Sequence, residues 1–154
     1  MELSEILRPA AVKVVSTVSS KKRLFQDLGD LVAGVYGIDA TAAFTALQDR
    51  ESLGPTGVGH GVALPHARID GLDRVVGAFL RLDKPVDFGS VDRQPVDLVF
   101  ALFAPEGAGV DHLKALALVS RTMRDQSVTA KLRANNDSET LHTILTDAQA
   151  IRAA

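Results

Sequence analysis

The sequence of 154 residues has no cysteine and no tryptophan, and aromatic residues make up only 5% of it. Without cysteine, the chain has no disulfide, no zinc site built on thiolates and no thiol nucleophile. The absence of cysteine also fits a reducing compartment, so we expect a cytoplasmic protein. The four histidines are therefore the side chains best suited to chemistry near neutral pH.

The chain also lacks an excess of basic residues and any long apolar run. Its formal net charge is -2 and its pI is about 6.1, whereas nucleic-acid binders carry clustered positive charge, so DNA and RNA are not expected partners. The N-terminus, MELSEILRPAAVKVV, is acidic where a signal peptide is basic, and no segment approaches the ~18 apolar residues of a membrane span. We therefore expect neither export by that route nor membrane insertion.

With 46% hydrophobic residues, the chain is long enough for one domain, which we place over residues 1–154. β-branched and continuous apolar runs predict strands over 12–18, 58–64, 75–82 and 96–104. Apolar residues at three- and four-residue spacing predict helices over 4–7, 20–36 (ending at Gly37), 40–50 (capped by Asp39), 112–125, 127–133 (capped by Ser127) and 139–150 (capped by Asp137 or Ser138).

The runs 75–82 and 96–104 show no alternation of apolar and polar residues. Such strands are covered on both faces and lie in the centre of a sheet. Because helices and strands alternate roughly along the chain, we expect an α/β fold with three layers.

Four glycines, Gly54, Gly57, Gly59 and Gly61, precede the predicted strand over 58–64. They match neither a Walker motif nor a dinucleotide-binding fingerprint, both of which place glycines ahead of a helix. Tight turns with close backbone packing are the simplest use of such a cluster. Glycine-rich backbone can also present N–H donors to a phosphate.

Other common site motifs are missing. There is no HExxH pattern, so no metal site is expected, and there is no GxSxG elbow that would mark Ser52 or Ser120 as a nucleophile. A Ser-His triad is left open, but no motif supports it. No cofactor-binding motif is present.

A histidine can itself be the nucleophile, because neutral imidazole accepts a phosphoryl group and passes it on readily. His66 follows Pro65 where a strand is predicted to end, and His112 opens a predicted helix whose N-terminus favours anions. Arg50, ahead of the glycine cluster, can add a bidentate cation. Each residue also has an ordinary structural use: a loop histidine, a helix-capping side chain and a solvated charge. His60 and His142 are expected at the surface.

Two segments carry a resemblance to a known family. DRESLGPTGVGHGVALPHARI at 49–69 and QPVDLVFALFAPEGAGVDHLKALALVSR at 94–121 are similar to the IIA component of the phosphoenolpyruvate-dependent phosphotransferase system, fructose and mannitol class. LSEILRPAAVKV and SSKKRLFQDLGDLVA further resemble its nitrogen-regulatory branch. The resemblance covers nearly the whole chain. Two departures are Pro55, where relatives often have serine, and Ala67-Arg68 in place of Gly-Lys, so we expect altered docking but retained chemistry.

The resemblance implies a mixed β-sheet with helices on both faces and no metal or nucleotide. It implies that His66 receives a phosphoryl group on Nε2 from an HPr-like carrier, with His112 and Arg50 lining the phosphate site. The protein would then regulate target proteins through its phosphorylation state. Targets linked to this branch are a potassium transporter, a sensor kinase and a stringent-response enzyme. Two alternatives stay open: a sugar-specific IIA component that passes phosphate to a IIB partner, and a non-catalytic binding module on the same fold.

Overall fold

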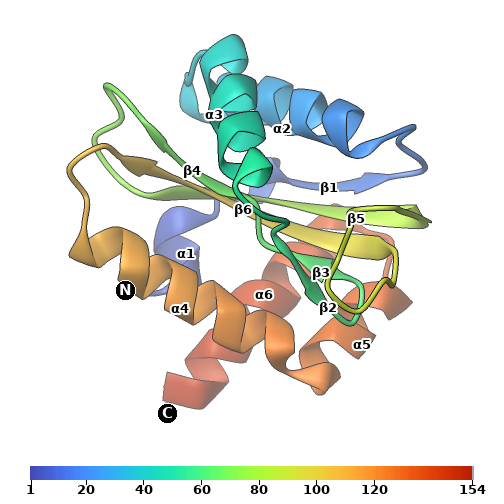
Figure 1. Cartoon of the computed structure of the whole chain (residues 1–154). Helices are drawn as coiled ribbons and strands as arrows, with labels where there is room; N and C mark the ends of the chain where they lie inside the picture. Colours follow the sequence, from blue (N-terminus) through green and yellow to red (C-terminus); the bar gives the residue numbers. More distant parts are fainter. Residues whose placement is uncertain (154) are drawn as a thin grey trace.

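Figure 1 shows a computed structural model of the chain, in which helices cover both faces of a six-stranded mixed sheet. The structure describes residues 1–153, with the backbone alone for 148–153, so Ala154, at the end of the domain expected over 1–154, lies outside the described residues. The strands are β1 (Val12–Val15), β2 (Gly57–Gly59), β3 (Val62–Ala63), β4 (His66–Ile69), β5 (Val76–Val86) and β6 (Val96–Pro105). The helices are α1 (Leu3–Ile6), the short 3-10 helix η1 (Pro9–Ala11), α2 (Lys21–Tyr36), α3 (Ala40–Ser52), α4 (Val110–Arg124), α5 (Gln126–Ala134) and α6 (Ser138–Ala153).

Strand β6 is the centre of the sheet, because β5 pairs with it on one side and β3 and β4 pair with it on the other. β5 runs antiparallel to β6, whereas β3 and β4 run parallel to it. β1 lies parallel to the outer side of β5, and β2 lies antiparallel to the outer side of β3. The prediction that the runs 75–82 and 96–104 are central strands is confirmed, as is the α/β fold with a mixed sheet.

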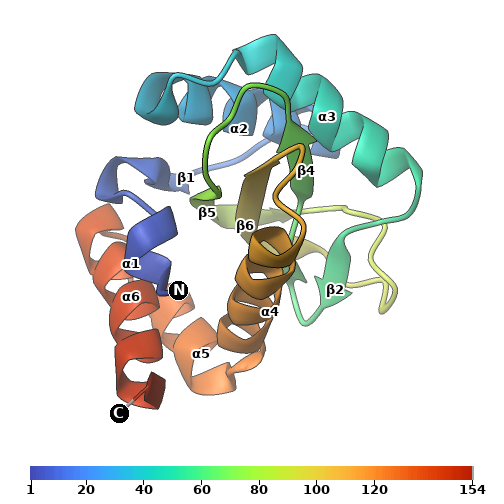
Figure 2. The ribbon, with the colours of Figure 1, turned by 90° about the vertical axis from the view of Figure 1, so that its left-hand side faces the viewer.

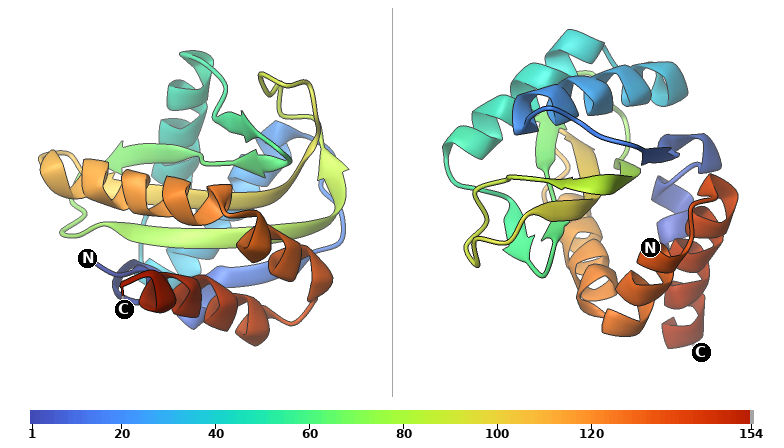
Figure 3. Two further views of the ribbon diagram at one scale, coloured as in Figure 1. Left: turned by 90° about the horizontal axis from the view of Figure 1, so that it is seen from below. Right: turned by 90° about the vertical axis from the view of Figure 1, so that its right-hand side faces the viewer.

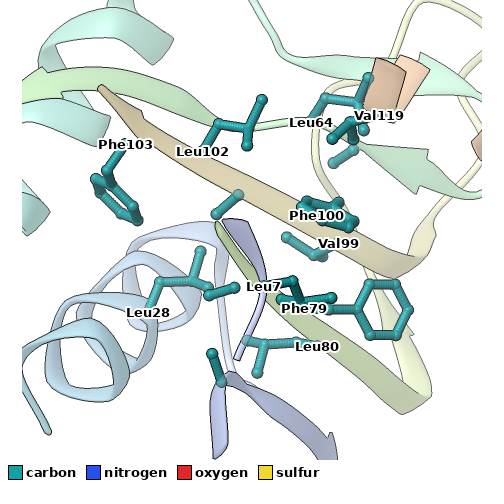
Figure 4. Packing of buried hydrophobic residues seen from close by; sticks show 14 of the residues in the cluster. Leu7, Leu28, Leu64, Phe79, Leu80, Val99, Phe100, Leu102, Phe103 and Val119 are labelled. Carbon is teal, nitrogen blue, oxygen red and sulfur yellow. The ribbon is translucent and has the colours of Figure 1, made fainter. Parts of the chain in front are cut away.

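Helices α2 and α3 lie on one face of the sheet, and α1, α4, α5 and α6 lie on the other (Figures 1 and 3). Neighbouring side chains of β6 point to opposite layers: Leu102 lies on the side of Val119, and Phe103 lies on the side of Leu28 (Figure 4). All four are buried. Apolar side chains are thus needed at successive positions of this strand, which explains why its sequence does not alternate.

The ends of α2 and α3 are fixed by local hydrogen bonds. The Ser20 hydroxyl accepts the Arg23 N–H at 3.1 Å, and α2 ends at Gly37, whose φ of 72° suits a residue without Cβ. The Asp39 carboxylate accepts the Ala42 N–H at 2.8 Å and caps α3. The predicted stop at Gly37 and cap at Asp39 are therefore confirmed.

The prediction of one strand over 58–64 is wrong. The chain turns back at His60 and Gly61, whose φ angles are 57° and 78°, so that β2 and β3 form a hairpin. Two successive residues with positive φ are typical of the tight turns whose twist matches that of the flanking strands.

The sequence analysis also missed β4. It is separated from β3 by Leu64 and Pro65, although both strands pair with the same side of β6. The Leu64 N–H donates to the Thr56 carbonyl at 2.9 Å, and proline has no N–H to offer. Pro65 therefore removes one N–H from the ladder immediately before His66, while its carbonyl still accepts the Leu102 N–H of β6 at 2.9 Å and the register is kept.

Several predicted boundaries shift. α1 begins one residue earlier than predicted, and β1 is shorter, ending at Val15. The cap of α5 is Asp125 rather than Ser127, because the Asp125 carboxylate accepts the Ser127 N–H at 2.9 Å. At the start of α6, Asp137 acts as one of the two predicted caps by accepting the Thr140 N–H at 3.1 Å.

Helix α4 begins at Val110, two residues before the predicted start at His112. Gly109 is its N-cap residue, with a non-helical φ of 38°. Its buried side includes Ala115 and Val119, while Val110 is 63% exposed and Leu113 is 68% exposed. The helix therefore presents apolar side chains to solvent in its first turn.

The packing of α2 against α3 predicts opposite effects for two glycines of α2. A Cβ on Gly29 would lie 2.7 Å from the Ala40 carbonyl oxygen, whereas a Cβ on Gly34 would meet nothing within 4 Å. We expect Gly34→Ala to raise the free energy of unfolding by about 0.5–1 kcal/mol, because alanine favours a helix. Gly29→Ala should lower it by roughly 1–3 kcal/mol, because the two helices must separate. Urea unfolding of both variants measures this, and equal stabilisation by both would contradict the packing.

Candidate functional site

His66 is the first residue of β4, whereas the sequence analysis placed it just after the end of a strand over 58–64. Its ring is part-buried, and its Nδ1 lies 2.9 Å from the Leu64 carbonyl oxygen. A carbonyl oxygen can only accept a hydrogen bond, so in the neutral ring Nδ1 carries the proton and Nε2 carries the lone pair. Pro65, between the two residues, has a fixed φ and restricts the backbone that joins them. The local fold therefore leaves Nε2 as the ring nitrogen with the free lone pair.

His112 lies in the first turn of α4 and is only 8% exposed. Its ring centroid is 5.7 Å from that of His66, with the two rings close to edge-on at 66°. Its Nε2 is buried and has no hydrogen-bond partner among the described residues. A buried polar atom without a partner costs free energy, so this nitrogen is suited to contact a group that enters the site.

Burial lowers the pKa of His112 below its ordinary value, and the positive charges that His66 and Arg68 can carry lower it further. His112 is therefore neutral at pH 7. In the neutral ring Nε2 acts as a donor when the proton lies on it and as an acceptor when it does not.

A cavity of about 460 Å³ joins these residues at the edge of the sheet. β4 pairs only with β6 there, so α3 on one face and α4 on the other both reach the same edge strand (Figure 2). The cavity is lined by Ala46, Asp49, Arg50, Leu53, His66, Ala67, Arg68 and His112. The three site residues singled out in the sequence, His66, His112 and Arg50, thus lie around one cavity although they belong to three different elements.

Two guanidinium groups lie at the cavity. Arg50 Nη1 donates to the Gly54 carbonyl at 3.0 Å, and Arg68 Nη1 donates to the Glu106 carbonyl at 2.7 Å. Because a guanidinium has several N–H groups, each arginine can keep its carbonyl and still contact an anion. The exposed Asp49 adds one carboxylate to the rim.

Arg68 was noted in the sequence only as part of a departure from the Gly-Lys of relatives and was not placed in the site. Side chains two apart in a strand point to the same face, so His66 and Arg68 share a face of β4. Recognising the short strand would have grouped them.

The glycine cluster has a structural use. No glycine is among the described residues that line the cavity, so the possible role of this backbone as a source of N–H donors to the site is not supported. A Cβ on Gly57 would lie within 2.1 Å of the Ser90 hydroxyl, which shows how closely the loop before β6 packs there.

The other two histidines lie away from the cavity. His60 is exposed at the turn between β2 and β3, as expected, and its N–H donates to Asp92 at 2.9 Å. His142 is not simply a surface residue: its ring is part-buried and its Nε2 lies 2.9 Å from the Leu7 carbonyl oxygen. This bond attaches α6 to the end of α1, where the backbone carbonyl needs a partner.

The described residues show neither a metal-binding cluster nor a membrane-spanning helix. They contain no group of three or more His, Asp or Glu side chains placed to hold a metal ion. No helix within residues 1–153 has both the length and the hydropathy needed to cross a bilayer.

The chain is similar to known proteins over almost its whole length. It is 47% identical to a nitrogen regulatory protein of Bradyrhizobium diazoefficiens, with 94% of this chain and 95% of that protein covered. It is 39% identical to a nitrogen regulatory protein of Pseudomonas aeruginosa, with 97% of each covered. The crystal structure of nitrogen regulatory protein IIA-Ntr from Neisseria meningitidis matches with a TM-score of 0.85 at 38% identity, covering 93% of this chain and 98% of that one.

The family resemblance stated from the sequence is confirmed by the family model that the chain matches. That model is described as phosphoenolpyruvate-dependent sugar phosphotransferase system, EIIA 2, and it covers residues 5–148. The chain therefore belongs to the EIIA 2 family of the phosphoenolpyruvate-dependent phosphotransferase system, and relatives that match it over nearly their whole length are nitrogen regulatory proteins.

Proposed function

We propose that this protein is a phosphocarrier that accepts a phosphoryl group on Nε2 of His66 and regulates other proteins through its phosphorylation state. The observation that carries the proposal is the hydrogen bond between His66 Nδ1 and the Leu64 carbonyl, at a cavity lined by Arg50 and Arg68. This bond leaves Nε2 unprotonated and therefore nucleophilic.

The proposed step is transfer from the phosphohistidine of an HPr-like carrier. The Nε2 lone pair of His66 forms a bond to phosphorus, while the P–N bond of the donor breaks and its electron pair returns to the donor nitrogen. The Nδ1 proton of His66 stays on its ring and in its bond to Leu64. No water and no metal are needed, so catalysis rests on positioning and on stabilisation of the transferred charge.

His112, Arg50 and Arg68 are the groups we propose for that stabilisation. The two guanidiniums offset the negative charge of the phosphoryl oxygens, and His112 Nε2 gains the partner that it lacks in the described residues. His112 has a further advantage because its ring is fixed by burial and loses little freedom when the anion arrives.

The rim of the cavity is suited to contact with another protein. Leu53, which lines the cavity at the end of α3, is 84% exposed, and Val110 and Leu113 are exposed in the same first turn of α4 as His112, outside the cavity lining. Exposed apolar side chains around a polar centre are typical of protein interaction sites. We propose that the HPr-like carrier docks here.

The regulatory part of the proposal rests on the relatives' names and on charge. Phosphorylation adds about -1.5 to -2 charges to this apolar rim, which changes the proteins that can bind it. We propose targets in nitrogen, potassium and stress signalling, as the resemblance implies. The runner-up is a sugar-specific component, which the sugar phosphotransferase description of the family model favours.

Phosphoryl acceptance is tested with phosphoenolpyruvate, Enzyme I and an HPr-like carrier. We expect an acid-labile phosphate on the wild type and none on His66→Ala, because the Nε2 of His112, the other histidine that lines the cavity, is buried. His60→Asn is the matched control: it removes an exposed histidine and should keep full incorporation, since asparagine tolerates positive φ. Incorporation by His66→Ala, or none by the wild type, would refute the proposal.

The pKa of His112 should respond to phosphorylation. Without phosphate, burial holds it below the ordinary value of 6.5. A dianion on His66, whose ring centroid is 5.7 Å away, favours the protonated form and should raise that pKa. NMR titration of the His112 ring in both forms measures the shift. An unchanged or lower pKa in the phosphorylated protein would show that the phosphate does not lie beside His112.

The sugar alternative differs in the fate of the phosphate. Phosphorylated protein mixed with a fructose-specific IIB component should keep its phosphate, because we propose that its phosphorylation state is the signal. Loss of label to IIB at the rate shown by a fructose-specific IIA control would instead favour a role in sugar uptake. Labelled phosphate on each protein, followed over time after separation, distinguishes the two.

A further inference from the structure

The Glu51 carboxylate is held almost out of solvent immediately after Arg50, with its side chain 7% exposed. Its Oε2 accepts the Lys21 ammonium at 3.0 Å and the Thr56 N–H at 2.9 Å, and its Oε1 accepts the Thr56 hydroxyl. A carboxylate with so little exposure requires compensation of this kind. Glu51 does not line the cavity and takes no part in the transfer step described above.

One chain of hydrogen bonds connects Glu51 to the His66 ring. The carboxylate fixes Thr56, and the Thr56 carbonyl accepts the Leu64 N–H at 2.9 Å. The other side of Leu64, its carbonyl, is the acceptor for His66 Nδ1. The peptide units that set the His66 tautomer are thus held in place from Thr56.

A second, shorter chain connects Glu51 to the Arg50 guanidinium. The Glu51 backbone carbonyl accepts the Gly54 N–H at 3.1 Å, and the Gly54 carbonyl accepts Arg50 Nη1 at 3.0 Å. The loop between α3 and β2 is therefore attached to Glu51 at both Gly54 and Thr56. Thr56 at one end of this loop bonds Leu64, the residue whose carbonyl accepts His66 Nδ1, and Gly54 near the other end bonds Arg50.

Lys21 completes the arrangement from another helix. It begins α2, and its Nζ lies 4.7 Å from the centroid of the Phe88 ring as well as beside Glu51. The ammonium balances the carboxylate charge, so the loop is held by a neutral pair that adds little net charge near the phosphate site.

We propose that the Glu51 carboxylate positions His66 for phosphoryl acceptance: through Thr56 and Leu64 it keeps the proton of His66 on Nδ1. The link to Arg50 through Gly54 uses the Glu51 backbone carbonyl, so it is kept whatever side chain stands at position 51. The proposal rests on the proposed function of His66. Its structural part, control of the His66 tautomer, is measurable whether or not the protein accepts phosphate.

The test compares Glu51→Ala with Glu51→Gln. Glutamine can still accept the Thr56 N–H with its oxygen and donate to the Thr56 hydroxyl, so it should retain most of the wild-type behaviour. Alanine should lower the rate of phosphoryl acceptance on the order of 10- to 100-fold, since small displacements of reacting groups have effects of this size. NMR of the histidine nitrogens should show a smaller fraction of His66 with its proton on Nδ1.

Asp137→Ala is the matched control. The Asp137 carboxylate also binds the N–H and the hydroxyl of one threonine, Thr140, at 3.1 and 2.8 Å, but it does so at α6 on the face of the sheet opposite to α3 (Figure 1). This variant should lose stability while keeping the wild-type tautomer and rate. If Glu51→Ala fails to fold, Thr56→Val removes the hydroxyl bond alone, and a smaller change in the same direction is expected.

An unchanged His66 tautomer and rate in Glu51→Ala would overturn the positioning role, as would the same losses in Asp137→Ala. A wild type that accepts no phosphate would overturn the proposed function instead. In that case the NMR comparison of wild type and Glu51→Ala still decides whether Glu51 positions His66.

Discussion

The hydrogen bond between His66 Nδ1 and the Leu64 carbonyl is the contact on which the rest of the site depends. The Pro65 carbonyl accepts the Leu102 N–H of β6, so the Leu64 carbonyl, one residue earlier in an extended chain, points to the side away from β6. On that side Thr56 accepts the Leu64 N–H, but β2 begins only at Gly57 and runs the other way, so the carbonyl is available to the His66 ring. The short outer strand therefore has a chemical consequence, which is a fixed tautomer.

The edge position of β4 explains how one cavity receives groups from both layers. Arg50 comes from α3 on one face and His112 from α4 on the other, and Arg68 shares the strand with His66. Burial keeps His112 neutral, so among the described residues that line the cavity the two arginines are the permanent cations. The site is thus able to attract an anion without strong repulsion among its own groups.

Much of this fold could be predicted from the sequence, because the long elements carry strong local signals. β5 and β6 are continuous apolar runs, and α2 and α3 have clear stops and caps at Gly37 and Asp39. The short elements around the site could not be predicted in the same way. β3 has two residues and β4 has four, and both are defined by pairing with β6 more than thirty residues later.

The candidate site could also be predicted only in part, because some of its features arise only when distant parts of the chain come together. His66, His112 and Arg50 stand out by residue type and by resemblance, but the burial of His112 depends on which side of α4 faces the sheet. Glu51 gave no signal, because its partner Lys21 is 30 residues away and contacts it only in the folded chain.

Whether Nε2 of His66 receives the phosphorus is tested most directly by NMR of the phosphorylated protein with labelled histidine nitrogens. Coupling between phosphorus and Nε2 of His66 is the predicted result, and coupling to Nδ1 or to another histidine would contradict it.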